Sequence, residues 1–297
     1  MNICRIHIRP RGGFANPEVS FRYCLKEQVL GVGWPTKTQK SGISWDEYEK
    51  EAAEIYGSGE LSRVRYLKTH IKPNDLLWTR DTKGNYYLAK VLSGWEYYTN
   101  KEAQDADITN VVRCKIHKVE SVDDVPGKVI ACFRPSRTIQ GIQDSVAQNY
   151  SRFLWNRLSA SNDFEINIDE FRNIFTFLDS EQTEDIIFIY LQTKGWIVVP
   201  NSRKADTMSY EFYLIRKEDH RRAVVQIKTG WTSLDTTEWK EATEHVFLFQ
   251  SNGQYQGMSE GNIECIEPKV VEDFIYGNLD LMPENISHWA KIVKNEI

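Results

Sequence analysis

The chain has 297 residues and a formal net charge of −5, and 41% of its residues are hydrophobic, with nine Trp and fourteen Tyr. This aromatic content excludes an intrinsically disordered chain, and the length is sufficient for two domains that each bury a core. Five widely spaced Cys and six scattered His, without a CxxC or HExxH motif, argue against a disulfide framework or zinc centre, so carboxylates would have to bind any catalytic metal ion.

Short runs rich in β-branched and aromatic residues dominate the first half of the chain. Gly, Pro, Asn and Asp separate these runs, which is typical of the strands of a compact barrel. The expected strands are 2–8, 28–33, 75–80, 86–94, 109–119 and 128–133, with a hairpin turn at 82–85. A helix is expected over 44–56, where Ser44 and Glu47 have the spacing of a capping box, and a second over 62–70.

The pattern becomes helical between residues 140 and 165, and a different order of elements follows. Helices are expected over 143–158, 168–177 and 180–193, the last ended by Gly195. The expected strands are 196–200, 210–215, 222–228, 244–250 and 262–266, with a linking helix after the third strand and a final helix over 268–276. This succession predicts an α/β domain with a mixed central sheet.

We therefore expect a first domain over 1–140, a helical connector over 141–165 and a second domain over 166–297. Residues 1–150 carry 22 Lys and Arg against 18 Asp and Glu, whereas residues 151–297 carry 15 against 24. The first half is thus the better candidate for binding a polyanion, although so small a surplus also fits an ordinary solvated surface. No long apolar segment is present at the start or later, so we expect a cytoplasmic protein without a membrane partner.

Three short motifs in the second half indicate chemistry on a phosphate. Glu184 lies near the start of an expected helix, Glu211 begins an expected strand, and Gln226 and Lys228 lie two residues apart on the next strand. Residues i and i+2 of a strand share one face, so Gln226 and Lys228 point the same way. Carboxylate and amide oxygens suit Mg²⁺, and Lys228 can polarise a water molecule or stabilise developing negative charge.

This constellation resembles the PD-(D/E)XK nuclease superfamily, and within it the Mrr-like restriction endonucleases, in which Gln commonly replaces the second acid. The resemblance extends over about 50 residues. It implies that Glu211 is the metal-binding acid, that Gln226 is the second metal ligand, and that Glu184 is an accessory acid. Family members usually carry Asp at the position of Glu211, so Asp206, five residues earlier, is the alternative metal ligand.

The first half resembles the PUA-like barrels, particularly the EVE and YTH modules that receive a flipped or modified base. Strand order and aromatic placement over most of residues 1–135 carry this resemblance. It implies a mostly β barrel with peripheral helices, in which Trp34, Trp78 and Trp95 form a base-binding cage and Asp107 reads the base edge. Since a Trp in a small barrel often belongs to the core, a structural role remains the alternative for each.

Arg134 and Arg137 are expected to contact the DNA backbone near the domain junction. Together the two resemblances imply a DNA endonuclease of a modification-dependent restriction or anti-phage system, with Mg²⁺ or Mn²⁺ as cofactor. Its partner would be DNA carrying modified bases, and because cleavage of both strands needs two active sites, a homodimer is expected at least on DNA.

Two other functions remain open from the sequence. The second domain can be a degenerate nuclease fold in a nucleic-acid-binding protein that has no catalytic activity. Alternatively, the first domain can recognise modified RNA, as YTH-like modules do. The convergence of Glu211, Gln226 and Lys228 on one accessible edge of the sheet distinguishes the nuclease from the first alternative.

Overall fold

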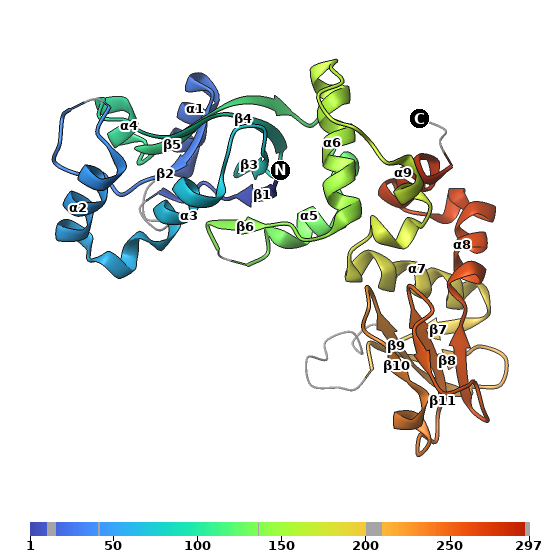
Figure 1. Cartoon of the computed structure of the whole chain (residues 1–297). Coiled ribbons are helices and arrows are strands. Elements are labelled where there is room, and N and C mark those ends of the chain that lie inside the picture. Colours follow the sequence, from blue (N-terminus) through green and yellow to red (C-terminus); the bar gives the residue numbers. More distant parts are fainter. Residues whose placement is uncertain (11–15, 41, 136, 200–209, 295–297) are drawn as a thin grey trace. The chain divides into compact units, whose positions relative to one another are not determined.

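The structure, a computed structural model, describes residues 1–10, 16–40, 42–135, 137–199 and 210–294. The chain divides into two compact units, Met1–Asn167 and Ile168–Ile297. Each unit has its own mixed β-sheet with helices packed around it, so the protein belongs to the mixed α/β class (Figure 1). In the described ranges, every helix is too short or too polar to span a bilayer.

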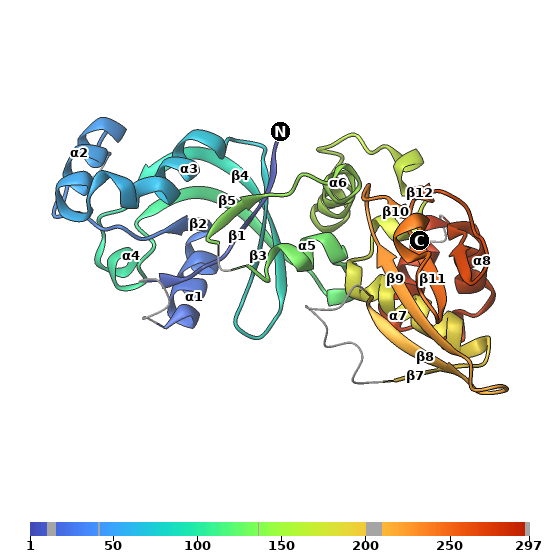
Figure 2. The same ribbon diagram turned by 90° about the horizontal axis from the view of Figure 1, so that it is seen from below.

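The first unit is built on a sheet that, in the described residues, has six strands in the order β2-β5-β4-β3-β1-β6. The strands are β1 (Ile3–Ile6), β2 (Val29–Val32), β3 (Leu76–Arg80), β4 (Tyr86–Tyr97), β5 (Asn110–Lys118) and β6 (Ile139–Gly141). β1 and β3 are parallel and the other neighbours are antiparallel. A register shift between Val91 and Trp95 increases the bend of β4, which Figure 2 shows as a long curved strand beside β5.

The expected closed barrel is not confirmed. Within the described part of the chain, β2 and β6 are the two ends of an open sheet, and no strand pairing joins them. The strand expected over 128–133 is wrong, because this segment forms the helix α5 (Gly127–Cys132). A short apolar run does not distinguish the two structures, and here Val129 and Phe133 are buried at the helical spacing of four residues.

Six helices in the described residues accompany the first sheet. They are α1 (Pro17–Glu27), α2 (Trp45–Tyr56), α3 (Ser62–His70), α4 (Lys101–Asp105), α5 and α6 (Ser145–Ser159). The capping box predicted from Ser44 and Glu47 is confirmed, since each residue bonds the backbone amide of the other. Helix α1 was not expected from the sequence, although Asn16 caps it and Pro17 occupies its first turn.

Trp78 connects α6 to the first sheet. Its ring is fully buried, and its indole N–H donates to Ser151 Oγ of α6 over 2.9 Å. Helix α6, which falls in the segment expected to be a connector, therefore packs as part of the first unit. A side chain without any exposed surface cannot stack on a ligand, so the assignment of Trp78 to a base-binding cage is corrected to a core position.

The second unit contains a sheet with five strands in its described residues, in the order β13-β11-β9-β8-β7. They are β7 (Trp196–Val198), β8 (Phe212–Arg216), β9 (Arg222–Lys228), β11 (His245–Gln250) and β13 (Ile263–Ile266). β7, β8 and β9 form an antiparallel meander, and β11 and β13 continue the sheet in parallel with β9. A separate short ladder pairs β10 (Leu234–Asp235) with β12 (Tyr255–Gln256).

The helices of the second unit are α7 (Ser180–Thr193), α8 (Pro268–Gly277) and α9 (Glu284–Val293). Gly195 follows α7 with a positive φ of 86°, as its expected role in ending the helix requires. Two expected helices are wrong: the segment 168–177 forms two short 3₁₀ turns, and the linking segment forms the short strand β10 and the 3₁₀ turn Thr236–Trp239. Helix α9, which buries Trp289 in a stack on Phe177, was not expected.

The burial of Trp78 leads to a stability prediction. Trp78→Ala removes a large core ring and its hydrogen bond, so we expect it to lower the free energy of unfolding of the first unit by about 3–5 kcal/mol. Urea unfolding followed by circular dichroism measures this difference. Trp231→Ala is the matched control, because Trp231 is 84% exposed. Equal stability of the two variants would contradict the core position of Trp78.

Candidate functional site

The pairing of β8 with β9 brings together three side chains that the sequence indicated. Phe212 pairs with Val225, and the backbone N–H of Glu211 donates to Val225 O over 2.7 Å, so Glu211 lies opposite Gln226. Gln226 Nε2 donates to Glu211 Oε1 over 3.0 Å. Lys228 Nζ lies 3.7 Å from the same carboxylate oxygen. The carboxylate, amide and ammonium groups thus form one cluster at the end of two neighbouring strands.

The cluster is open to solvent at one side and rests on apolar side chains at the other. The side chains of Lys228 and Glu211 are 41% and 31% exposed, whereas Gln226 is buried. Val224 lies on the same face of β9 as Gln226 and Lys228. With Leu248 of β11, it belongs to a buried apolar cluster. The polar groups therefore lie at the margin of a packed layer, where a ligand can reach Lys228 and Glu211.

Glu184 comes from α7, the helix that covers the opposite face of the sheet. Phe188, one helical turn after Glu184, packs on Phe212 with ring centroids 5.4 Å apart. Strand alternation directs the side chains of Phe212 and Glu211 to opposite faces. Glu184 is half-buried in the second turn of α7. Asp206, the alternative metal acid, lies outside the described residues.

The donor set of the cluster fits a hard divalent cation. Glu211 supplies carboxylate oxygens and Gln226 an amide oxygen, which are ligands that Mg²⁺ and Mn²⁺ prefer over nitrogen or sulfur. In the described ranges, no three His, Cys, Asp or Glu side chains gather at one place. Within the cluster, Glu211 and Gln226 are the two side chains that offer such oxygen atoms.

A hydrogen-bonded loop beside the cluster displays an exposed Trp that the sequence did not single out. The fully buried Gln250 donates from Nε2 to the carbonyls of Gly230 and Thr232, over 2.7 and 3.0 Å. Asn252 Nδ2 also donates to Gly230 O over 2.7 Å. These bonds fix the backbone around Trp231, whose side chain remains 84% exposed three residues after Lys228. Sequence gives no signal for this arrangement, because Trp is more often buried.

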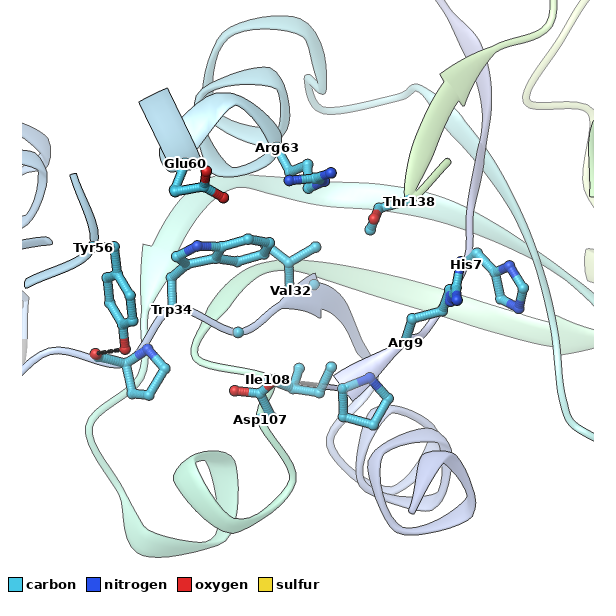
Figure 3. A pocket seen from close by; sticks show the side chains of 14 residues that line it. His7, Arg9, Val32, Trp34, Tyr56, Glu60, Arg63, Asp107, Ile108 and Thr138 are labelled. Carbon is cyan, nitrogen blue, oxygen red and sulfur yellow. Dashed lines mark hydrogen bonds between the residues drawn. The ribbon is translucent and has the colours of Figure 1, made fainter. Parts of the chain in front are cut away.

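The first unit contains the Trp34 cavity, a space of about 710 Å³ whose lining includes Trp34 and Asp107, two of the expected base-binding residues. Figure 3 shows Glu60 and Arg63 above the Trp34 ring and Asp107 below it in this view. The lining also includes residues that the sequence reasoning missed: His7, Arg9, Val32, Tyr56, Glu60, Arg63, Ile108 and Thr138. These come from segments far apart in the chain, and no local sequence motif connects them.

Trp34 is held in place through the backbone around it. Tyr48 Oη donates to Trp34 O over 3.0 Å, and Tyr56 Oη donates to Pro35 O over 2.6 Å. Trp34 itself has a positive φ of 65°, and the Arg63 guanidinium lies 5.9 Å from the centre of its ring. The Trp34 ring is an aromatic wall of the cavity with a cation next to one face, which suits stacking on a planar ligand.

The carboxylate of Asp107 lies against Gly33 and occupies the space that a side chain at residue 33 would need. A Cβ at Gly33 would lie 2.3 Å from Asp107 Oδ1, so a larger residue at this position would displace the Asp107 carboxylate. Asp107 is buried and has a positive φ of 53°. Trp34 and Asp107 thus both have a positive φ, which is energetically unfavourable for residues other than glycine. Such backbone strain is concentrated at ligand-binding sites.

The other predicted contact residues lie elsewhere in the first unit. Trp95 packs edge-on against Trp45 and donates from Nε1 to Asn110 Oδ1 over 3.0 Å. It lines a different cavity, of about 520 Å³, so the structure does not bring it into one cage with Trp34. Arg134 and Arg137 are both exposed, and the carbonyl of Arg137 accepts a hydrogen bond from Arg5.

His7 lies at the opposite end of the Trp34 cavity from Tyr56 in Figure 3. Its Nδ1 atom is buried without a hydrogen-bond partner. Burial, together with the positive charges of Arg80, Arg5 and Arg9, lowers the pKa of His7 from 6.5 to about 4. The imidazole is therefore neutral near pH 7, and the surrounding potential is positive.

Comparisons of this chain with protein-family models, with curated proteins and with solved structures find no match. The function is accordingly inferred from the geometry of the two sites.

The lowered pKa of His7 makes the stability of the first unit depend on pH. Between about 4 and 6.5, the unfolded chain binds a proton at residue 7 that the folded chain does not, so stability decreases as the pH falls through this window. We expect His7→Gln to reduce the dependence measured by urea unfolding across this range. His70→Gln, at an exposed His of the same unit, is the control. An unchanged slope in the His7 variant would contradict the assignment.

Proposed function

We propose that this protein is a metal-dependent DNA endonuclease of the modification-dependent type. The second unit would hydrolyse a phosphodiester bond as a PD-(D/E)XK nuclease, and the first would hold an extruded base as a PUA-like reader. The observation that carries the proposal is the meeting of Glu211, Gln226 and Lys228 at one accessible end of the sheet. Such an enzyme would act in the cytoplasm on invading DNA, as a dimer while it cuts both strands.

Each residue of the cluster has a separate role in this proposal. Glu211 and Gln226 hold the divalent cation, which when bound neutralises the phosphate and promotes ionisation of a water molecule. Lys228 places its ammonium group where negative charge develops on the phosphate oxygens. Its 41% exposed side chain allows direct contact with the backbone of DNA. Trp231, on the neighbouring hydrogen-bonded loop, presents a ring on which a base can stack.

The Trp34 cavity supports recognition of a base that has left the helix. Trp34 offers a stacking face, and Asp107 is an acceptor for an exocyclic amino group, such as N4 of cytosine or N6 of adenine. The cavity volume of about 710 Å³ accommodates a base with a substituent. Glu60 and Arg63 lie beside the ring and would contact groups added to the base edge.

A binding protein without catalytic activity is the second candidate, and one observation favours it. Glu211 already accepts a hydrogen bond from Gln226 and lies within ion-pair distance of Lys228. A carboxylate satisfied in this way can serve to stabilise the ends of β8 and β9. In that case the first unit would bind DNA or RNA, and the second would be a scaffold.

The Lys228→Ala variant distinguishes the two candidates. We expect it to lower the rate of Mg²⁺-dependent cleavage by about 100-fold or more, because it removes the charge next to the reacting phosphate. DNA binding, measured by electrophoretic mobility shift, should be retained. Lys217→Ala is the control, since Lys217 is exposed at the other end of β8. Metal-dependent cleavage that persists in purified Lys228→Ala protein would refute the assignment.

A further inference from the structure

A second hollow lies next to the Trp34 cavity and shares part of its lining. It has a volume of about 170 Å³, and its lining residues include Arg80, Asp81 and Thr82 in addition to His7, Arg9 and Pro10, which also line the Trp34 cavity. The end of β1 and the residues after it thus separate two adjoining spaces. His7, Arg9 and Pro10 therefore face both spaces.

Arginine side chains gather on this side of the first sheet. Arg5 of β1 is fully buried, and its guanidinium donates to backbone carbonyls, including Pro135 O and Thr138 O, and to Gln140 Oε1. These partners are uncharged. The guanidinium groups of Arg5 and Arg80 lie 5.6 and 5.2 Å from the centre of the same Phe133 ring. Burial, together with the positive charges of Arg137, Arg80 and Arg9, lowers the pKa of Arg5, so these like charges repel one another.

The acidic residue that lines the hollow is engaged in its own turn. Asp81 Oδ1 accepts from the backbone amides of Lys83 and Asn85, and Oδ2 accepts from the Asn85 side chain and from Tyr87. The charges that lower the pKa of His7 are all arginines. The buried Nδ1 of His7, which has no partner, lies in the lining shared by both spaces. Two guanidinium groups, Arg9 and Arg80, and one carboxylate, Asp81, line the hollow, so positive charge is in excess there beside the unsatisfied Nδ1 of His7.

We propose that Arg9, Arg80 and His7 form a phosphate-binding subsite for the nucleotide whose base occupies the Trp34 cavity. The ligand class is a nucleoside bearing a phosphomonoester or phosphodiester. Arginine suits this ligand because its planar guanidinium donates two parallel hydrogen bonds to phosphate oxygens. The inference rests on the proposed base-reading function, and it assigns backbone contacts to residues other than Arg134 and Arg137.

The subsite is tested by comparing a nucleoside with its phosphates. Isothermal titration of the whole protein with deoxycytidine, its 5′- and 3′-monophosphates, the deoxyadenosine counterparts and inorganic phosphate supplies the affinities. We expect at least one monophosphate to bind about tenfold or more tightly than its nucleoside, because a hydrogen bond to a charged group contributes more than a neutral one. Arg80→Gln should remove this advantage and leave the affinity for the nucleoside unchanged.

Two further variants keep the test conclusive. Arg9→Gln probes the same subsite from an exposed side chain if Arg80→Gln does not fold, and Arg22→Gln, exposed on α1, is the control. Binding of inorganic phosphate that depends on Arg80 or Arg9, without binding of any nucleoside, would retain the subsite and refute the base-reading function. A phosphate advantage that survives both substitutions, or binding of neither phosphate nor monophosphates, would overturn the subsite.

Discussion

The register between β8 and β9 is the constraint on which the proposed chemistry depends. It sets Glu211 opposite Gln226, and the strand period of two then places Lys228 on the same face. A slip of one residue would exchange the two faces of a strand and disperse the cluster. Apolar layers oppose such a slip, because Phe212 packs under α7 while Val224 contributes to the core of the other face. The fold thus specifies a polar group of three residues through the packing of its apolar neighbours.

The first unit uses backbone conformation for the same purpose. Gly33 allows the Asp107 carboxylate to approach the chain closely, and Tyr48 and Tyr56 fix the carbonyls that follow. Trp34, which packs against the apolar core of the first unit, thereby also forms a wall of the cavity. The arginines around His7 add positive charge at the far end of this space. The aromatic wall, the carboxylate acceptor and the arginines are the groups that would contact the proposed nucleotide ligand.

Sequence reasoning succeeded where local pattern and final packing agree. Strand β9 was predicted with its observed bounds, and the hairpin before it made the meeting of Glu211 with Gln226 foreseeable. The prediction was wrong at 128–133, because so short an apolar run does not show whether its hydrophobic residues repeat with the period of a helix or of a strand. It was also wrong at Trp78, because the residue type alone does not tell a buried Trp from an exposed one. The cavity partners of Trp34, such as Arg63, come from distant segments, and only the fold brings them together.

Cleavage of DNA duplexes that share one sequence and differ only in cytosine or adenine modification tests the central claim most directly. The whole protein is incubated with each duplex in the presence of Mg²⁺ or of a chelator, and the products are separated on a denaturing gel. Hydrolysis by the Glu211 cluster, directed by the Trp34 cavity, predicts metal-dependent degradation of one modified duplex and survival of the unmodified one. Intact duplexes in every metal-containing reaction, with the protein bound to DNA, would contradict it.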